Sequence, residues 1–215
     1  MLYEFKGLRP YVHEEAFVHP QANVTGNVEI YENVYIGPGA VVRGDWGKIV
    51  IKAGANVQEN CVIHMFPGIT VMIEEGAHLG HGCIVHGAYI GKNALIGMNA
   101  VIMDDAQIGE NSIIGALSFV KAEMVIPNRK VVAGNPAKII KDVSDEMISW
   151  KTNGTELYQK LPNECHTHLK ETTSLKSPEN QVNEEIVSYK TWKKNKLKIV
   201  LYNMVVYDRI YVLFS

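Results

Sequence analysis

A six-residue period runs through most of the chain and restricts its fold more than any other feature. Four positions after most of the period's large aliphatic residues, called anchors below, stands a small or β-branched residue. A helix would show spacings of three and four, and a hairpin strand simple alternation, so neither explains the period. Each hexapeptide would form one strand and a turn, with its anchor inside. The sequence therefore predicts an all-β solenoid, a left-handed parallel β-helix. The anchors are Val18, Val24, Ile30, Ile36, Val42, Ile51, Val57, Ile63, Ile73, Leu79, Val85, Ile90, Ile96, Ile102, Ile108, Ile114 and Val120.

The pattern divides the chain into three parts. Residues 1–135 form the predicted β-helix, with extra residues extruded as corner loops at 46–48 and 65–70. From Pro136 the apolar spacing becomes helical, which predicts a C-terminal α-helical segment over residues 136–170, with Ser144 as its N-cap and a break near Asn153 and Gly154. Residues 171–215 form a tail of uncertain structure. Its last stretch, 197–215, is apolar but carries charges that argue against a membrane span.

Composition excludes several classes of protein. A formal net charge of −2 and a pI near 6.4 provide no basic surface, so nucleic acid is not an expected partner. The N-terminus shows no leader pattern, and we expect a cytoplasmic protein that does not enter a membrane. Three irregularly spaced cysteines predict reduced thiols, with Cys61 and Cys83 packed at stacked small-residue positions.

Three histidines have the spacing of a metal site. His64 and His86 each follow an anchor, and those anchors lie three repeats apart, so both imidazoles should point outward from one face, one above the other. His81 belongs to the preceding face, and one subunit cannot easily bring all three rings together. In a homotrimer, His81 of a neighbouring subunit can join them on zinc at about 2.0–2.1 Å and leave an open position for water. The simpler alternative is that these are ordinary surface histidines, as we expect for His13, His19 and His78.

Four further residues are candidates for the chemistry. Arg43 shares the face of His64 and His86, and Asp45 follows two positions later. We expect Arg43 to hold an anionic substrate or product while Asp45 fixes its geometry, although a purely structural ion pair explains the two equally well. Gln58 and Glu59, just before the strand of His64, could orient the metal-bound water and relay protons.

Several segments together resemble the γ-class carbonic anhydrase family, and within it the phenylacetic acid degradation (PaaY) and carnitine operon (CaiE) branch. The resemblance covers residues 8–170 and implies a trimer with three interfacial sites for Zn²⁺ or Fe²⁺, and either CO2 hydration to bicarbonate or acyl-CoA thioester hydrolysis. Trp46 and the loop after His64 stand where the archetypal member has acidic proton-shuttle residues, which argues against fast hydration. The segments are Arg43-Gly44-Asp45, Asn56 to His64, Gly80 to Gly87, and Ile96 to Ala100.

Three functions therefore remain open. The first is a metal-dependent lyase or thioester hydrolase with the ligands His64, His81 and His86. The second is a hexapeptide acyltransferase with a coenzyme A donor, which the same fold often hosts and which needs one interfacial base rather than three converging imidazoles. The third is a metal-stabilised accessory protein of coenzyme A-linked catabolism. Zinc content and the effect of metal removal distinguish them.

Overall fold

The computed structural model describes residues 1–177, 189 and 192. Residues 1–170 form one compact unit, and everything below concerns this unit. The apolar stretch 197–215 lies outside the described residues. Among those that are described, no helix is both long and apolar enough to cross a membrane.

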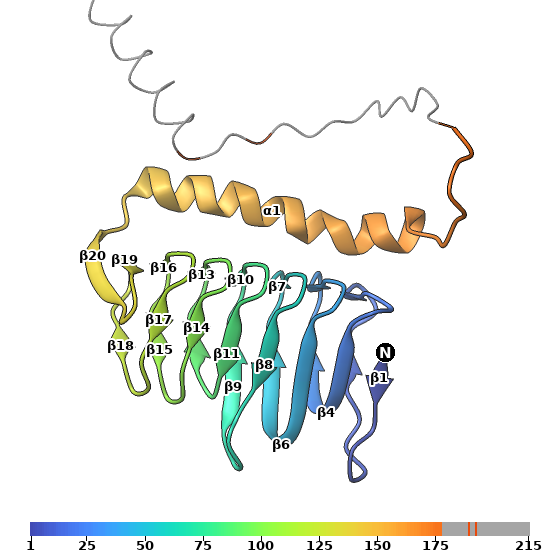
Figure 1. Cartoon of the computed structure of the whole chain (residues 1–215), viewed down its shortest axis with the longest axis horizontal. Coiled ribbons are helices and arrows are strands. Elements are labelled where there is room, and N and C mark those ends of the chain that lie inside the picture. The colour runs from blue at the N-terminus through green and yellow to red at the C-terminus, as the bar shows by residue number, and fades with distance from the viewer. Residues whose placement is uncertain (178–188, 190–191, 193–215) are drawn as a thin grey trace, which may run out of the picture. The chain divides into compact units, whose positions relative to one another are not determined.

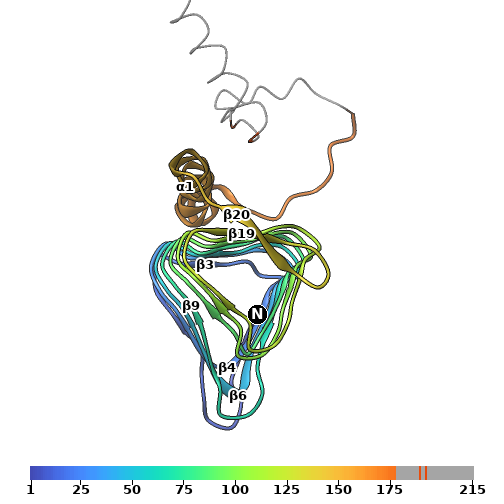
Figure 2. The same ribbon diagram turned by 90° about the vertical axis from the view of Figure 1, so that its left-hand side faces the viewer.

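Short parallel strands wind into a triangular β-helix of about seven turns, which confirms the predicted fold (Figure 2). Strands β4 (Asn23–Ile30) and β6 (Val41–Ile51) are long enough to pass around a corner and belong to two faces. The first face adds β1 (Leu2–Tyr3), β8 (Val62–His64), β11 (Ile84–His86), β14 (Val101–Ile102) and β17 (Phe119–Val120). The second adds β2 (Tyr11–Val12), β9 (Thr70–Ile73), β12 (Tyr89–Ile90), β15 (Gln107–Ile108) and β18 (Val125–Ile126). The third contains β3 (Phe17–Val18), β5 (Tyr35–Ile36), β7 (Asn56–Val57), β10 (His78–Leu79), β13 (Leu95–Ile96), β16 (Ile113–Ile114), β19 (Lys130–Ala133) and β20 (Lys138–Asp142).

The interior of the coil is the apolar core, and the anchors fill it. Apart from Val18, which is partly buried, every anchor is fully buried. The small residues four places later are buried too, because the chain can turn tightly there only without a bulky side chain. Cys61 and Cys83 occupy two such positions with their sulfurs 3.6 Å apart, and both are free thiols, as the sequence predicted.

The corners depend on residues that tolerate a left-handed backbone. Asn33, Asn60, Asn93, Asn99 and Asn111 all have φ between 53° and 60°. Asparagine adopts this conformation more readily than most residues with a Cβ atom, which explains its recurrence at the turns.

The sequence predicted corner loops at 46–48 and 65–70, and the first of these predictions is wrong. Residues 46–48 lie inside strand β6, whose residues 48–51 pair with β9, so the extra residues extend a strand around the corner instead of leaving it. The second loop, between β8 and β9, is present and includes Phe66.

The C-terminal segment begins as a strand, which corrects the expected helix start at Pro136. Strand β20 pairs antiparallel with β19, because the last coil offers a sheet edge whose hydrogen-bonding groups need partners. Helix α1 (Asp145–His168) follows and continues without a break through Asn153 and Gly154. Ser144 is its N-cap, as predicted, with its hydroxyl oxygen accepting from Met147 N. Figure 1 shows α1 running back along the β-helix, and its residues contact β3, β5 and β7.

Candidate metal centre

The two histidines expected to stack do stack. In the parallel pairing of β8 with β11, His64 stands directly opposite His86, and their ring centroids are 5.3 Å apart. The His64 side chain is only 10% exposed and that of His86 is 24% exposed. Because the rings leave the coil at the ends of these strands, they form a shelf of two imidazoles on one edge of the β-helix.

Arg43 and Asp45, both on β6, meet at His64. The Nε2 atom of His64 lies 2.9 Å from an Arg43 guanidinium nitrogen and 2.9 Å from Asp45 Oδ1. A single ring nitrogen accepts from Arg43 when it is deprotonated or donates to Asp45 when it is protonated, so the two hydrogen bonds alternate. A metal on this nitrogen would have to displace both groups. The expected proximity of Arg43 to the histidines is therefore present, and the Arg43–Asp45 contact at 3.5 Å is looser than either contact with His64.

His86 has a partner that the sequence analysis missed. The Asp104 carboxylate, from the turn after β14, lies 2.6 Å from His86 Nδ1. That contact leaves Nε2 as the nitrogen available for a ligand. Asp104 follows anchor Ile102 by two positions, and this placement one coil beyond His86 was the available signal.

His81 lies in the turn after β10 and also has a carboxylate partner. Its Nδ1 is 2.5 Å from Glu59 Oε2, and its side chain is 43% exposed. Tyr35 donates a hydrogen bond of 3.3 Å to the other oxygen of Glu59. Burial and the nearby Glu59 charge raise the pKa of Tyr35, which keeps the phenol protonated as a donor. In this chain Glu59 is therefore the ion-pair neighbour of His81, although its Oε2 atom has no hydrogen-bond partner of good geometry.

Gln58 is held by a further, partly buried histidine, His78. The Gln58 amide donates to Asn56 Oδ1 at 3.0 Å and to His78 Nε2 at 2.6 Å, while Gln58 Oε1 accepts from His81 N at 3.2 Å. Burial lowers the pKa of His78 to about 3, so its ring is neutral and can accept. The expectation that His78 is an ordinary surface residue is wrong. His78 is the partly buried acceptor that orients Gln58.

The candidate residues form two groups in one chain. Arg43, Asp45, His64 and His86 come together, whereas Gln58, Glu59 and His81 lie at another corner. No three His, Cys, Asp or Glu side chains in the described part of the chain gather as a metal-binding group. A three-histidine site on these residues therefore requires a second chain.

Two exposed aromatic rings flank the pair of histidines. Trp46 lies 5.2 Å from the His64 ring, and Phe66 lies 5.1 Å from the His86 ring at an interplanar angle of 85°. Both are at least half exposed. The edge thus presents polar ring nitrogens between apolar walls.

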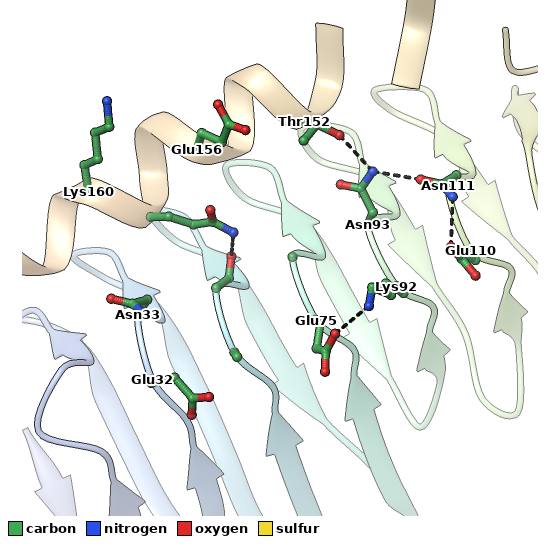
Figure 3. A pocket seen from close by; sticks show the side chains of 14 residues that line it. Glu32, Asn33, Glu75, Lys92, Asn93, Glu110, Asn111, Thr152, Glu156 and Lys160 are labelled. Atoms are coloured by element: carbon green, nitrogen blue, oxygen red, sulfur yellow. Dashed lines mark hydrogen bonds and ion pairs between the residues drawn. The ribbon is translucent and has the colours of Figure 1, made fainter. Parts of the chain in front are cut away.

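A separate groove of about 860 Å³ lies between α1 and another corner of the coil (Figure 3). Glu75 and Lys92 form an ion pair of 2.7 Å in it, and Asn93 joins Thr152 of α1 to Asn111. None of the candidate metal or catalytic residues lines this groove.

Comparison with known proteins assigns the family. A family model described as bacterial transferase hexapeptide (six repeats) matches residues 9–44 and 87–122. The carnitine operon protein CaiE of Escherichia coli O157:H7 is 47% identical over 177 residues, covering 82% of this chain and 90% of that protein. CaiE of Escherichia coli K12 matches to the same extent.

Two solved structures share the architecture. A hexapeptide transferase family protein from Anaplasma phagocytophilum is 32% identical with a TM-score of 0.73, covering 76% of this chain and 96% of that one. A Bacillus cereus protein provisionally assigned as an acetyltransferase is 32% identical with a TM-score of 0.76, covering 77% and 96%. The chain therefore belongs to the hexapeptide-repeat proteins, in the γ-class carbonic anhydrase-like branch that includes CaiE.

Proposed function

We propose that the protein is a metal-dependent enzyme of the γ-class carbonic anhydrase type, with its sites between the subunits of a homotrimer. His64 and His86 of one subunit and His81 of a neighbour would hold Zn²⁺ or Fe²⁺. The observation that carries the proposal is the in-register stack of His64 on His86, with Asp104 occupying the Nδ1 side of His86. A pair of ordinary surface histidines would need neither this stacking nor a carboxylate at Nδ1.

The donor set fits a zinc ion. Zinc takes imidazole nitrogens, and metal-ligating histidines almost always donate their other ring N–H to a carboxylate, a carbonyl or water. His81 and His86 both have a carboxylate at Nδ1, at 2.5 and 2.6 Å. The third ligand, His64, has its Nε2 engaged by Arg43 and Asp45 instead, and these two are the groups that metal binding would release.

The released groups have a role in the chemistry. A metal with an open fourth position would supply a water molecule acidified to near neutral pH. Arg43, with 48% of its side chain exposed, can then hold the negative charge that develops on bicarbonate or on a tetrahedral oxyanion. Gln58 is buried and its two amide N–H groups donate to Asn56 and His78, so orienting a reacting water would require one of these hydrogen bonds to open.

The aromatic walls favour a thioester over carbon dioxide as the substrate. Carbon dioxide is too small to use Trp46 and Phe66, whereas an acyl group can cover both rings. Hydrolysis of an acyl-CoA thioester consumes one water and releases a carboxylate, which Arg43 can bind, and a thiol. Burying an apolar group as large as a valine or leucine side chain against each ring would contribute about 1.5–3 kcal/mol to the free energy of substrate binding.

An acyltransferase is the second candidate, because the Bacillus cereus structure at 32% identity is provisionally assigned as an acetyltransferase. Such an enzyme would transfer the acyl group to an acceptor other than water and would not need three imidazoles.

Metal analysis and an activity panel on the purified protein test these candidates. We expect zinc bound in the trimer, hydrolysis of acyl-CoA thioesters that stops on demetallation, and slow CO2 hydration. The Trp46→Ala and Phe66→Ala variants should raise the KM for long acyl chains about tenfold, equivalent to 1.4 kcal/mol, without changing CO2 hydration. His168→Ala, an exposed histidine on α1, is the matched control for metal content. Acetyl transfer by a zinc-free protein would favour the acyltransferase, and rates unchanged by demetallation would favour an accessory role.

A further inference from the structure

Asp104 contacts a candidate metal ligand but belongs to a different coil. Its side chain is 17% exposed, and its Oδ1 atom lies 2.6 Å from Nδ1 of His86. A contact this short between a carboxylate and an imidazole N–H is a charge-assisted hydrogen bond. Its neighbour Asp105 is exposed and makes no such contact with a described histidine.

The backbone around Asp104 fixes this contact. Gly87 N donates to His64 O at 2.9 Å, and Asp105 N donates to Gly87 O at 3.0 Å, so hydrogen bonds connect three successive coils at this corner. Gly87 has φ +62°, and a Cβ atom on it would lie 2.7 Å from Asp104 Oδ1. The glycine therefore satisfies the turn and also leaves the space that the carboxylate occupies.

The hydrogen bond determines which nitrogen of His86 carries the proton. A neutral imidazole has one N–H and one lone pair, and the group that accepts from the N–H selects the tautomer. With Asp104 at Nδ1, the lone pair is on Nε2. Phe66 lies edge-on to the same ring, with 5.1 Å between the two ring centroids.

We propose that Asp104 is a positioning residue for the metal site, which holds His86 as the Nδ1–H tautomer and points Nε2 at the ion. The proposal rests on the proposed function for the identity of the ligand. Glu59 lies beside His81 at an ion-pair distance of 2.5 Å, without the hydrogen-bond geometry of the Asp104–His86 contact, and Tyr35 donates to its other oxygen. Each subunit would thus supply one carboxylate for each of these two imidazoles.

The test combines three variants with two measurements. Asp104→Ala removes the acceptor, Asp104→Asn keeps an oxygen that can accept from Nδ1–H, and Asp105→Asn is the matched control, because asparagine tolerates the left-handed backbone of Asp105, which has φ 57°. Zinc affinity is measured by chelator competition on the intact protein. The His86 tautomer is measured by nitrogen-15 NMR of the metal-free protein at alkaline pH, with the His86 signals assigned through His86→Ala.

We expect Asp104→Ala to lower zinc affinity about 10–100-fold and to lose the Nδ1–H tautomer. Asp104→Asn should keep the tautomer and most of the affinity, and Asp105→Asn should match the wild type in both. Wild-type affinity or an unchanged tautomer in Asp104→Ala would overturn the proposal while leaving the zinc site standing. A wild-type trimer that binds no zinc would instead overturn the proposed function, and with it the metal-positioning role of Asp104.

Discussion

Polar side chains stack from coil to coil at two corners of the β-helix, but they form different kinds of cluster. At the corner under α1, called closed here, the polar groups hydrogen-bond to one another. Lys151 of α1 is buried there and donates to Gly76 O and Asn93 Oδ1, each at 2.6 Å. The Asn93 amide donates in turn to Asn111 at 2.8 Å and Thr152 at 3.0 Å. These groups satisfy one another and join the helix to three coils (Figure 3).

At the histidine corner, called open here, part of the hydrogen-bonding capacity is unused. His86 is satisfied on its Nδ1 side by Asp104, while its other ring nitrogen has no hydrogen bond to another described residue. At His64, Arg43 and Asp45 compete for one nitrogen. A polar cluster that serves stability exhausts its hydrogen-bonding capacity within the fold. A ligand site requires an oriented ring with a nitrogen that is available for the ligand.

The largest effect is expected at the open corner. His86→Ala and His81→Ala should each abolish stoichiometric zinc binding, since each removes one of three ligands. The coiled β-sheet signal in circular dichroism should persist, because the core consists of aliphatic anchors. Elemental analysis after dialysis measures the metal. If either variant keeps its zinc, that histidine is not a ligand.

The next largest effect is expected for Arg43→Gln, on turnover. Loss of an anion-holding donor should lower turnover about 100-fold, with the trimer and its metal intact. Steady-state kinetics, light scattering and zinc analysis on the same preparation separate this from a structural role. Wild-type rates on CO2 and on acyl-CoA thioesters would remove Arg43 from the chemistry and leave Gln58 and Glu59 as the remaining candidates.

At the closed corner the effect should be on stability alone. Asn93→Gly keeps the left-handed turn but removes the hydrogen bonds to Thr152 and Asn111 and leaves Lys151 with Gly76 O as its remaining acceptor, which should cost about 1–3 kcal/mol of unfolding free energy. Asn99→Gly is the matched control, because Asn99 has φ 54° against 53° for Asn93 but is exposed. Denaturant unfolding measures both. Equal losses in the two variants would mean that the cost comes from the turn and not from the network.

A further stability effect at this corner is a pH dependence from Lys151. Burial lowers the pKa of Lys151 to about 7, whereas an unfolded lysine titrates near about 10.4. Between these values the unfolded chain binds more protons, so the free energy of unfolding should rise as pH increases from about 7 to about 9.5. Lys151→Met should flatten this rise, and Lys160→Met, exposed on the same helix, should retain it. Identical slopes in all three proteins would contradict the lowered pKa.

Much of the architecture could be predicted because the six-residue period of the sequence gives the register of the β-helix strands. A residue that follows an anchor points outward, and anchors three repeats apart stack, which placed His64 on His86 and Arg43 beside them. The errors occur where the register is interrupted. Residues 46–48 extend β6 where its pairing with β4 shifts register. Residues 138–142 form β20 on the last coil, because an unpaired strand edge offers hydrogen-bonding groups to nearby chain whatever its apolar spacing.

The sequence by itself determined the fold, the core and the stacked pair of histidines, since all three follow from one period. Only the tertiary structure decided what holds those histidines. Asp104 reaches His86 from 18 residues further along the chain, and the partly buried His78 orients Gln58 from 20 residues away. These contacts depend on side chains that cross from one coil to the next at a corner. Their direction there is fixed by the local turn, and by a missing Cβ atom at Gly87, neither of which the six-residue period specifies.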